Sequence, residues 1–449
     1  DPHHEQAMRA LEMLYAAQES WEKLAALLGR RLDGAAGDEA IGLRLRLGTL
    51  HATRLGDFAR ALDHLEVVLG ADPGEKAARD LVEQCLAKSE LRARAAVVLE
   101  AAYLATDQPR DLVRVLDVRL ESAAGDEARA ELLRRIAELR DDRLNEDVAA
   151  LDAYAKLVPI APDDENARAR LLDIARRVGS HEQAAGVLLA ASKNARAPQP
   201  KGEILMSVAK IFEDLLDAPS RAESVYREVL ELDRTDHALA LPAARALERI
   251  YAAENRPREL ADVLRVQVEL EDDGEARRAI WARLGDIHEN ALDDPSAAIA
   301  AWRARAEDDP ADEQALAALD RLYGRTEQWD ALASVLRSRE RASTDGDRRK
   351  ELMTRLALVL AERLNDTNEA ILAYRAILDD FGSEHAVLAP IAALYEKAER
   401  WDELAETLEA DLAIAEVPVD KMELLARLGR VRRDKQDDAP GALEAFRQA

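Results

Sequence analysis

The sequence predicts an all-α solenoid of stacked helical modules, and three observations support this prediction. The 449-residue chain is 48% apolar but only 4% aromatic, a composition typical of Ala- and Leu-rich helices rather than of a β-sandwich. Independently chosen columns of residues recur along the chain with the same irregular steps. Between turn signals, apolar residues recur every three or four positions, which is the spacing of one helix face.

A repeat of about 72 residues is defined by a column that holds Trp in three of its six positions. The column consists of Trp21, Pro109, His181, Pro257, Trp329 and Trp401. Its steps are 88, 72, 76, 72 and 72 residues. A second column is a small Ala with steps of 89, 72, 76, 72 and 72, and it consists of Ala61, Ala150, Ala222, Ala298, Ala370 and Ala442. Because both columns shift together, we divide the chain into six modules, numbered 1 to 6.

Two further columns are mostly aromatic. The first consists of Tyr15, Tyr103, Ala175, Tyr251, Tyr323 and Tyr395. The second lies four residues after the small Ala and consists of Leu65, Tyr154, Tyr226, Trp302, Tyr374 and Phe446. We expect the tyrosines of the first column to pack in the core, although their hydroxyls could also face a groove. The three Trp residues of the repeat-defining column are expected to pack between repeats.

Each module divides into four amphipathic helices, which we call A, B, C and D. In module 4 they are expected over 240–253, 257–270, 275–290 and 295–307. Asp294 followed by Pro295 is a typical helix start, because Asp caps free backbone N–H groups and Pro is tolerated at the first helical position. The four extra residues between Tyr226 and Pro257 are about one helical turn, which predicts a longer helix A in module 4.

Helices C and D resemble a tetratricopeptide repeat (TPR). That family's pattern is a Leu-Gly pair, an aromatic residue, a small Ala, a second aromatic residue and a closing Pro. In module 4 these positions are Leu284-Gly285, His288, Ala298, Trp302 and Pro310. The gap between the Gly and the Ala is one residue longer than is usual in the family. The resemblance implies a right-handed superhelical solenoid of helix-turn-helix repeats, with helices A and C lining its concave face.

The array is interrupted once. Between Pro73 and Pro109 lie 17 more residues than in the corresponding interval of module 5, enough for one extra helix over Glu75–Lys88. We therefore predict a first module at 1–74, an interrupting helix at 75–90 and a continuous solenoid at 91–449.

Both ends of the sequence match interior positions of the repeat. Asp1-Pro2 corresponds to the end of a helix D, and Ala449 falls short of the closing position of module 6. We expect a fragment of a longer array with uncapped ends. The excess of Arg over Lys and the high Ala content suggest a bacterial source, and the sequence assigns no compartment.

Charge and cysteine content exclude several functional classes. With 63 Lys plus Arg against 89 Asp plus Glu, the net charge of −26 repels the phosphates of nucleic acids. The longest apolar runs are only a few residues, so no membrane insertion is expected. Cys85 is the only cysteine, which excludes an internal disulfide and a Cys-based zinc site. We expect Cys85 to be a small core residue.

No constellation of catalytic, cofactor-binding or metal-binding residues is identifiable. The phosphate-loop, dinucleotide, zinc-protease and serine-hydrolase motifs are all missing from the sequence. His3 and His4 are interpreted as a solvated pair, and His288 as a packing residue. The acidic stretches at 272–275 and 345–347 are interpreted as turns between helices B and C. We predict no enzyme, no cofactor and no metal.

Two ladders of polar residues run along helix C. The first consists of Arg46, Arg135, Ser207, Arg283, Arg355 and Arg427. The second consists of Thr53, Asp142, Asp214, Asn290, Glu362 and Asp434. The ladders are seven residues apart, nearly two turns, so they flank the same edge of the apolar stripe. Acids near a helix C-terminus oppose the macrodipole, so something must offset them.

Two interpretations of these ladders remain open. We favour the one in which each Arg pairs with a carboxylate on a neighbouring helix and sets the repeat spacing. In the other, an acidic strip lines the groove and binds Lys or Arg of a partner, worth about 0.2–1 kcal/mol per exposed pair. The strip consists of Asp141, Asp142, Glu213, Asp214, Glu289, Asn290, Glu362 and Asp434.

The sequence thus predicts a non-catalytic scaffold that binds a protein or peptide on a concave, acidic face. Stacked repeats leave a long surface suited to extended segments or helices. The net charge predicts a basic or neutral partner and salt-sensitive binding. Two alternatives stay open: a structural subunit that self-associates through uncapped ends, and the regulatory arm of an enzyme outside this fragment.

Overall fold

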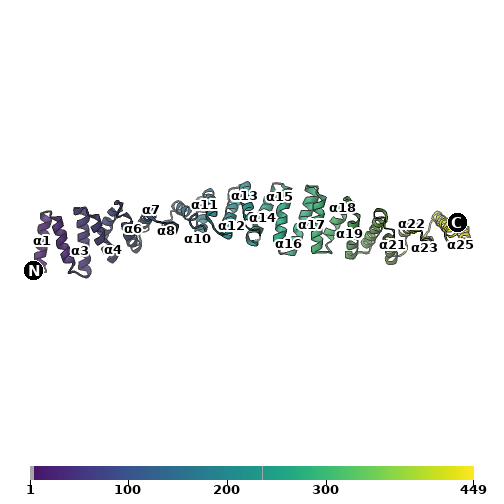
Figure 1. The fold of residues 1–449 in the computed structure, drawn as a ribbon, viewed down its shortest axis with the longest axis horizontal. Coiled ribbons are helices and arrows are strands. Elements are labelled where there is room, and N and C mark those ends of the chain that lie inside the picture. Colours follow the sequence, from purple (N-terminus) through teal and green to yellow (C-terminus); the bar gives the residue numbers. More distant parts are fainter. Residues whose placement is uncertain (1–4, 235) are drawn as a thin grey trace. The chain divides into compact units, whose positions relative to one another are not determined.

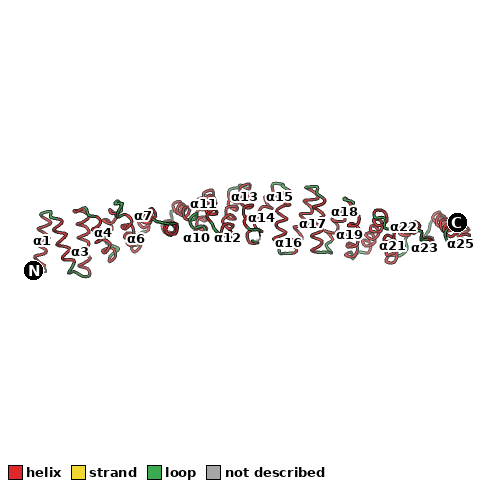
Figure 2. The backbone as a smooth tube through the Cα atoms, viewed as in Figure 1, coloured by secondary structure: helices red, strands yellow, loops and turns green. Residues whose placement is uncertain are grey.

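A computed structural model describes residues 5–234 and 236–449, and within these ranges all regular structure is helical (Figures 1 and 2). His3, His4 and the opening Asp1-Pro2 lie outside the described residues. The chain divides into two compact units, Asp1–Leu239 and Ala240–Ala449. The predicted all-α fold is confirmed. The described residues include no helix long and apolar enough to cross a membrane.

The first unit contains modules 1 to 3 and an extra helix. Module 1 comprises α1 (Glu5–Ala17), α2 (Trp21–Leu32), α3 (Gly37–Leu50) and α4 (Phe58–Ala71), followed by the extra helix α5 (Lys76–Cys85). Module 2 comprises α6 (Arg92–Ala105), α7 (Pro109–Ser122), α8 (Asp126–Glu138) and α9 (Asp147–Leu157). Module 3 comprises α10 (Glu165–Val178), α11 (His181–Asn194), α12 (Pro198–Lys210) and α13 (Pro219–Leu232).

The second unit contains modules 4 to 6. Module 4 comprises α14 (His237–Ala253), within which the boundary between the units lies, α15 (Pro257–Leu270), α16 (Gly274–Asp286) and α17 (Pro295–Asp308). Module 5 comprises α18 (Glu313–Arg325), α19 (Trp329–Ala342), α20 (Gly346–Leu358) and α21 (Thr367–Phe381). Module 6 comprises α22 (His385–Lys397), α23 (Trp401–Ile414), α24 (Pro418–Asp434) and α25 (Ala439–Gln448).

The predicted helices are therefore found with small shifts at their ends. Helix α14 has 17 residues where α18 and α22 have 13, which confirms the longer helix A of module 4. The extra helix α5 is shorter than predicted and packs against both α4 and α6, while α4 also contacts α6 directly. The division of the chain near residue 90 stays a prediction, and the two compact units are divided at Leu239 instead.

Helices pack mainly on their neighbours in sequence, as a repeat stack requires. In the second unit, α16 contacts α17, α17 contacts α18, and the succession continues to α25. One hydrophobic cluster accordingly runs from Ala282 to Ala445 without interruption. The small Ala column lies at its centre, because Ala298 and Ala370 are completely buried.

Twelve left-handed residues, one in each hairpin turn, confirm the register of the modules. Turns between helices A and B place φ between 50° and 76° at Glu19, Asp107, Gly179, Asn255, Glu327 and Glu399. Turns between helices C and D place φ between 47° and 67° at Gly56, Asn145, Asp217, Asp293, Asn365 and Asp437. These residues repeat the irregular steps of the sequence columns. Left-handed backbone is uncommon outside Gly, so its recurrence at equivalent positions reflects one shared turn geometry.

Helix C ends in a single π-helical turn in modules 1 to 5. These turns are η1 (His51–Leu55), η2 (Leu139–Arg143), η3 (Ile211–Leu215), η4 (Ile287–Ala291) and η5 (Val359–Arg363). In module 4 the N–H of Leu292 donates to the carbonyl of Ile287, five residues earlier, at 3.1 Å. A π-turn accommodates one additional residue, which accounts for the longer Gly-to-Ala gap in these modules. Module 6 keeps that gap, although α24 continues as an α-helix to Asp434.

The hairpin of helices C and D is closed by a small residue facing a large one. A Cβ atom added to Gly285 would lie 2.3 Å from the indole nitrogen of Trp302, which is almost completely buried. Gly48 faces Leu65 and Gly429 faces Phe446 in the same way. Gly285 and Trp302 are both positions of the TPR-like pattern in module 4.

The core interpretations of single residues are also confirmed. Tyr103, Tyr251, Tyr323 and Tyr395 are buried, as are Cys85 and His288. Tyr15 is only half-buried and packs against the smaller cluster of module 1. The three Trp residues of the repeat-defining column are partly buried at the starts of α2, α19 and α23. Each lies under a cation from the end of helix C of its own module, in the pairs Trp21–Arg54, Trp329–Arg363 and Trp401–Lys435.

Candidate functional site

Arg residues of helix C reach across to carboxylates on helix A of the same module. The pairs are Arg46–Glu12, Arg135–Glu100, Arg283–Glu248, Arg355–Asp320 and Arg427–Glu396. The pairing is close, with 2.6 Å between Arg135 and Glu100 and 2.7 Å between Arg355 and Asp320. The five Arg residues of the ladder are thus paired with carboxylates of another helix, as the favoured interpretation expects, and the role of these pairs in setting the repeat spacing stays a prediction. We call the surface that these paired residues of helices A and C share the A–C face.

Helix B supplies a third member in four modules. The same helix-A carboxylates accept hydrogen bonds from Arg31, Arg119, Gln267 and Arg339. The most buried of these triads is in module 5, where Asp320 is 2% exposed and Arg339 is 4% exposed. In module 1, burial alone would raise the pKa of Glu12, but hydrogen bonds from Arg46 and Arg31 lower it below its usual value. Each carboxylate therefore joins helices A, B and C through charge-assisted hydrogen bonds.

Module 6 replaces the triad by a different arrangement. The helix-A position is Ala392, and the helix-B position is Asp411, which is buried. The Nδ1 atom of His385 lies 2.8 Å from a carboxylate oxygen of Asp411. Here the acid has moved to helix B, and its partner is an imidazole from the start of helix A.

Three residues of the predicted acidic strip form contacts within the chain. Asp141 is buried and pairs with Arg177 at 2.5 Å and with Arg170 at 3.2 Å, both on α10. Glu289 pairs with Arg321 of α18 at 2.6 Å. Glu213 accepts a hydrogen bond from the Tyr226 hydroxyl at 2.7 Å.

Asp141 and Glu289 thus join one module to helix A of the next. The hydrogen bond from Arg321 to Glu289 also raises the pKa of that guanidinium. An acid held by such a pair offers little to an incoming cation, because its charge is already matched at close range.

The other five residues of the strip are exposed: Asp142, Asp214, Asn290, Glu362 and Asp434. Asp142 lies 3.3 Å from Arg170, and Asp434 lies 2.7 Å from Arg433. Among the described residues, no ion pair engages the side chains of Asp214 or Glu362. The strip thus contains three residues that are buried or half-buried in contacts within the chain and five exposed residues, of which Asp142 also pairs with Arg170 of α10.

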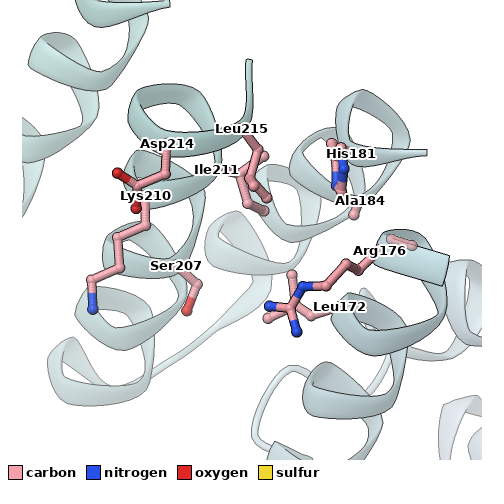
Figure 3. A pocket seen from close by; sticks show the side chains of 10 residues that line it. Leu172, Arg176, His181, Ala184, Ser207, Lys210, Ile211, Asp214 and Leu215 are labelled. Carbon is pink, nitrogen blue, oxygen red and sulfur yellow. The ribbon is translucent and has the colours of Figure 1, made fainter. Parts of the chain in front are cut away.

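Module 3 departs from the pattern at all three triad positions. Leu172 replaces the helix-A carboxylate, Ala191 replaces the helix-B residue, and Ser207 replaces the helix-C Arg. A cavity of about 270 Å³ opens at this place, between α10, the start of α11, α12 and η3. Its lining consists of Leu172, Ala175, Arg176, His181, Ala184, Ser207, Lys210, Ile211, Asp214 and Leu215 (Figure 3). We call it the module 3 pocket.

The pocket occupies space that larger side chains have at equivalent positions of the other modules. Ala175 stands where the five other modules have Tyr, and Ser207 stands where they have Arg. Ala184 stands where they have Leu, in the column Leu24, Leu112, Leu260, Leu332 and Leu404. Three truncations in one module therefore converge on one cavity, whose walls belong to helices that pack on one another.

Charged side chains surround the apolar interior of the pocket. Figure 3 shows Arg176 next to Leu172 on one side and Lys210 next to Ser207 on the other. Asp214 and Lys210 come from the same helical segment, four residues apart. Within the described part of the chain, no side-chain hydrogen bond or ion pair engages Arg176, Lys210 or Asp214. The rim thus offers two unmatched cations and one unmatched carboxylate.

The sequence contained the signal for this pocket, but column-by-column reading missed it. Ala175 and Ser207 were visible as exceptions, each in its own column. Leu172 and Ala184 are exceptions in two further columns, one mostly acidic and one otherwise all Leu. Only the fold shows that these four positions face one cavity.

The chain offers little for metal or nucleophilic chemistry. The described residues include no group of three or more His, Cys, Asp or Glu side chains that could hold a metal ion. Burial raises the pKa of the Cys85 thiol, which disfavours the reactive thiolate.

Comparisons with known proteins find similar solved structures but no matching family model and no matching curated protein. Three similar solved structures are the following. A chain of Naa15/Naa10 bound to HypK-THB has 13% identity and a TM-score of 0.30, over 94% of this chain and 68% of that one. The TPR domain of P58(IPK) has 15% identity and a TM-score of 0.22, over 88% and 99%. The C-terminal part of a TPR repeat-containing protein from Cytophaga hutchinsonii has 14% identity and a TM-score of 0.27, over 57% and 99%.

Proposed function

We propose that this chain is a non-catalytic scaffold whose A–C face binds a protein partner. One observation supports the proposal above others: the second polar ladder is solvent-exposed in every module, from Thr53 to Asp434. In modules 2 and 4 the adjacent residues Asp141 and Glu289 are held by ion pairs to the next module, so the ladder there is presented by a fixed frame. The TPR resemblance implies that this face is concave, which suits an extended or helical partner.

The partner's contacts are assigned to the exposed members of the acidic strip. Asp142, Asp214, Asn290, Glu362 and Asp434 are the candidate contacts, whereas Asp141, Glu213 and Glu289 keep the face in position. A basic or neutral partner fits the net charge of −26, since like charges would oppose association. Each exposed pair is worth about 0.2–1 kcal/mol, so several must act together.

A charge-reversal capture experiment tests the proposal. The variant Asp142→Lys/Glu362→Lys alters one exposed ladder residue in each unit. The control Glu231→Lys/Asp379→Lys makes the same change of charge at exposed positions of helix D in α13 and α21. Both proteins and the wild type are used as bait in lysate, and captured proteins are quantified by mass spectrometry at two salt concentrations.

We expect proteins that bind the wild type and the control, are lost with the ladder variant, and are reduced at high salt. Equal capture by all three baits would remove the exposed ladder from consideration.

A structural, self-associating subunit is a second candidate, favoured by exposed apolar side chains in module 6. Val419, Met422 and Leu443 are each more than half exposed. Soluble monomers seldom expose several large apolar groups near one another. Sedimentation velocity across a wide concentration range separates the candidates, because a scaffold of this kind stays monomeric while a self-associating subunit does not.

A further inference from the structure

The module 3 pocket has the dimensions and lining of a site for one large side chain. Its volume of about 270 Å³ arises where a Tyr, a Leu and an Arg of the repeat are shortened to Ala175, Ala184 and Ser207. Leu172, Ile211 and Leu215 supply the remaining apolar wall. Water against these apolar walls has few hydrogen-bond partners. An apolar side chain that displaces it also leaves bulk water itself, and this transfer favours binding.

The walls of the pocket are already in place. Helix α10 packs on α11, α11 packs on α12, and η3 packs on both α11 and α13. Ala175, Ala184 and Ile211 are buried in these contacts. Since the frame is made of packed helices, an occupant has little ordering entropy to overcome.

The rim differs in charge from the rest of the A–C face. The equivalents of Arg176 in the other modules are Ala16, Leu104, Ala252, Gly324 and Glu396, none of them cationic. Lys210 stands where modules 1, 2, 4 and 5 have Thr49, Glu138, Asp286 and Leu358, whereas module 6 has a cation there, Arg430. Only module 3 has a cation at both positions, because module 6 has Glu396 in place of Arg176. Two cations without an ion-pair partner among the described residues thus flank the apolar cavity, with Asp214 as the single acid. A carboxylate near the occupant's apolar group complements them.

From this geometry we propose that the module 3 pocket binds one Phe, Tyr, Trp or Leu side chain of a partner polypeptide that carries Asp or Glu close to it in sequence. The proposal rests on the scaffold function and deepens it, because it gives the A–C face a specific anchoring point. The apolar side chain fills the space between Leu172 and Ala184. The adjacent carboxylate lies at one of the two rim cations, Arg176 or Lys210.

The test uses a phage-displayed library of random peptides selected against the full chain. Variant Ala175→Tyr/Ala184→Leu fills the pocket with the repeat's own residues. Variant Arg176→Ala/Lys210→Ala removes the rim cations. Control Lys193→Ala/Arg196→Ala removes two exposed cations elsewhere in module 3. Selected peptides are synthesised and their affinities measured by fluorescence anisotropy, with circular dichroism to verify folding and Ala184→Leu alone as a milder filled variant.

We expect enriched peptides to share one large apolar residue with Asp or Glu within two positions. Filling the pocket should weaken their binding by at least about tenfold, the loss typical of a buried anchor. Removing the rim cations should weaken it by about threefold at low salt and less at high salt, while the control leaves it unchanged. Replacing the peptide's apolar residue by Ala should not weaken its affinity for the filled variant any further. The peptide change and the pocket change remove the same contact, so their effects on affinity should not add.

Several outcomes would overturn the proposal. These are peptides that bind the filled variant as well as the wild type, enrichment of Lys- and Arg-rich peptides only, or no peptide that distinguishes the two proteins. Self-association that filling abolishes would also overturn it, by assigning the pocket to a second copy of this chain. In each case the scaffold function is judged separately by the Asp142→Lys/Glu362→Lys capture experiment, which leaves the pocket intact.

Discussion

Modules 3 and 5 place opposite chemistry at the same three positions. In module 5, Asp320 lies buried between Arg339 of helix B and Arg355 of helix C. In module 3, the equivalent residues are Leu172, Ala191 and Ser207, and a pocket opens beside them. The surrounding helices, turns and π-turn are the same. Buried charge at this place is therefore not needed to form a module, and the loss of the helix-C Arg at Ser207 is one of the three truncations that leave the cavity.

Removing the central acid of module 5 should have the largest effect. Asp320→Ala leaves the buried Arg339 with Glu313 as its remaining carboxylate and removes the partner of Arg355, at a cost of about 3 kcal/mol in unfolding free energy. Urea denaturation followed by circular dichroism measures the loss. The triple variant Asp320→Leu/Arg339→Ala/Arg355→Ser installs the residues of module 3 and should lose less than the single variant. Equal losses would show that the triad's charges are not coupled.

A second variant tests the small residue that closes the C–D hairpin. Gly285→Ala should lose about 1–3 kcal/mol, because its new methyl group overlaps the buried indole of Trp302. Modules 3 and 5 combine Ala with Tyr at these positions, so Gly285→Ala/Trp302→Tyr should recover part of the loss. Gly324→Ala is the matched control: no atom lies within 4 Å of its added Cβ, and it should gain about 0.5–1 kcal/mol. Thermal unfolding compares all three, and a stable Gly285→Ala would contradict the overlap.

Helix caps give a third comparison between modules. The carboxylate of Asp294 accepts from the N–H of Ala297 at 3.0 Å, whereas module 3 has Ala218 at that position. Asp294→Ala should cost about 1 kcal/mol in urea denaturation, and Ala218→Asp should stabilise the first unit by a similar amount. If neither substitution changes the free energy of unfolding, tertiary packing alone stabilises these helix ends.

The smallest predicted effect concerns pH. Burial, and then Arg265, lower the pKa of His288 below its ordinary value of 6.5. The folded state thus binds this proton more weakly than the unfolded state. The stability that neutral His288 contributes is complete above about pH 6.5 and is lost as pH falls toward the lowered pKa, by at most about 1.4 kcal/mol per pH unit. His288→Leu, the residue of module 5, should flatten urea midpoints between pH 7 and pH 5. An unchanged slope would assign the pH dependence to other groups.

The sequence predicted most of the fold because each module repeats the same signals. Six copies of a column expose a register that one copy would hide, and the steps of 88, 72, 76, 72 and 72 return in the left-handed turn residues. The π-turns were visible only as one surplus residue per hairpin. Residue type gives no preference for that turn, and left-handed Glu19, Glu327 and Glu399 would not be expected from side chain alone.

The candidate site was predicted less well, for reasons of helix phase. Asp141 and Asp142 are adjacent in sequence but point about 100° apart on a helix, so one is buried by Arg177 while the other faces solvent. The positions of the acids can be read from the sequence. The direction in which each side chain points at the π-turn cannot, and this direction determines which acid is buried and which is exposed. Predicting the pocket requires knowing that three shortened residues, Ala175, Ala184 and Ser207, lie close together in space. No single column of the sequence indicates a cavity.

The triads also determine how far each module can loosen. One carboxylate that bonds three helices makes their separation a single event, since opening any interface breaks the same set of hydrogen bonds. Module 3 lacks this shared set of hydrogen bonds, so we expect α10 and α12 to separate locally without disrupting the neighbouring helices. Amide hydrogens in module 3 should therefore exchange with solvent sooner than those of module 5.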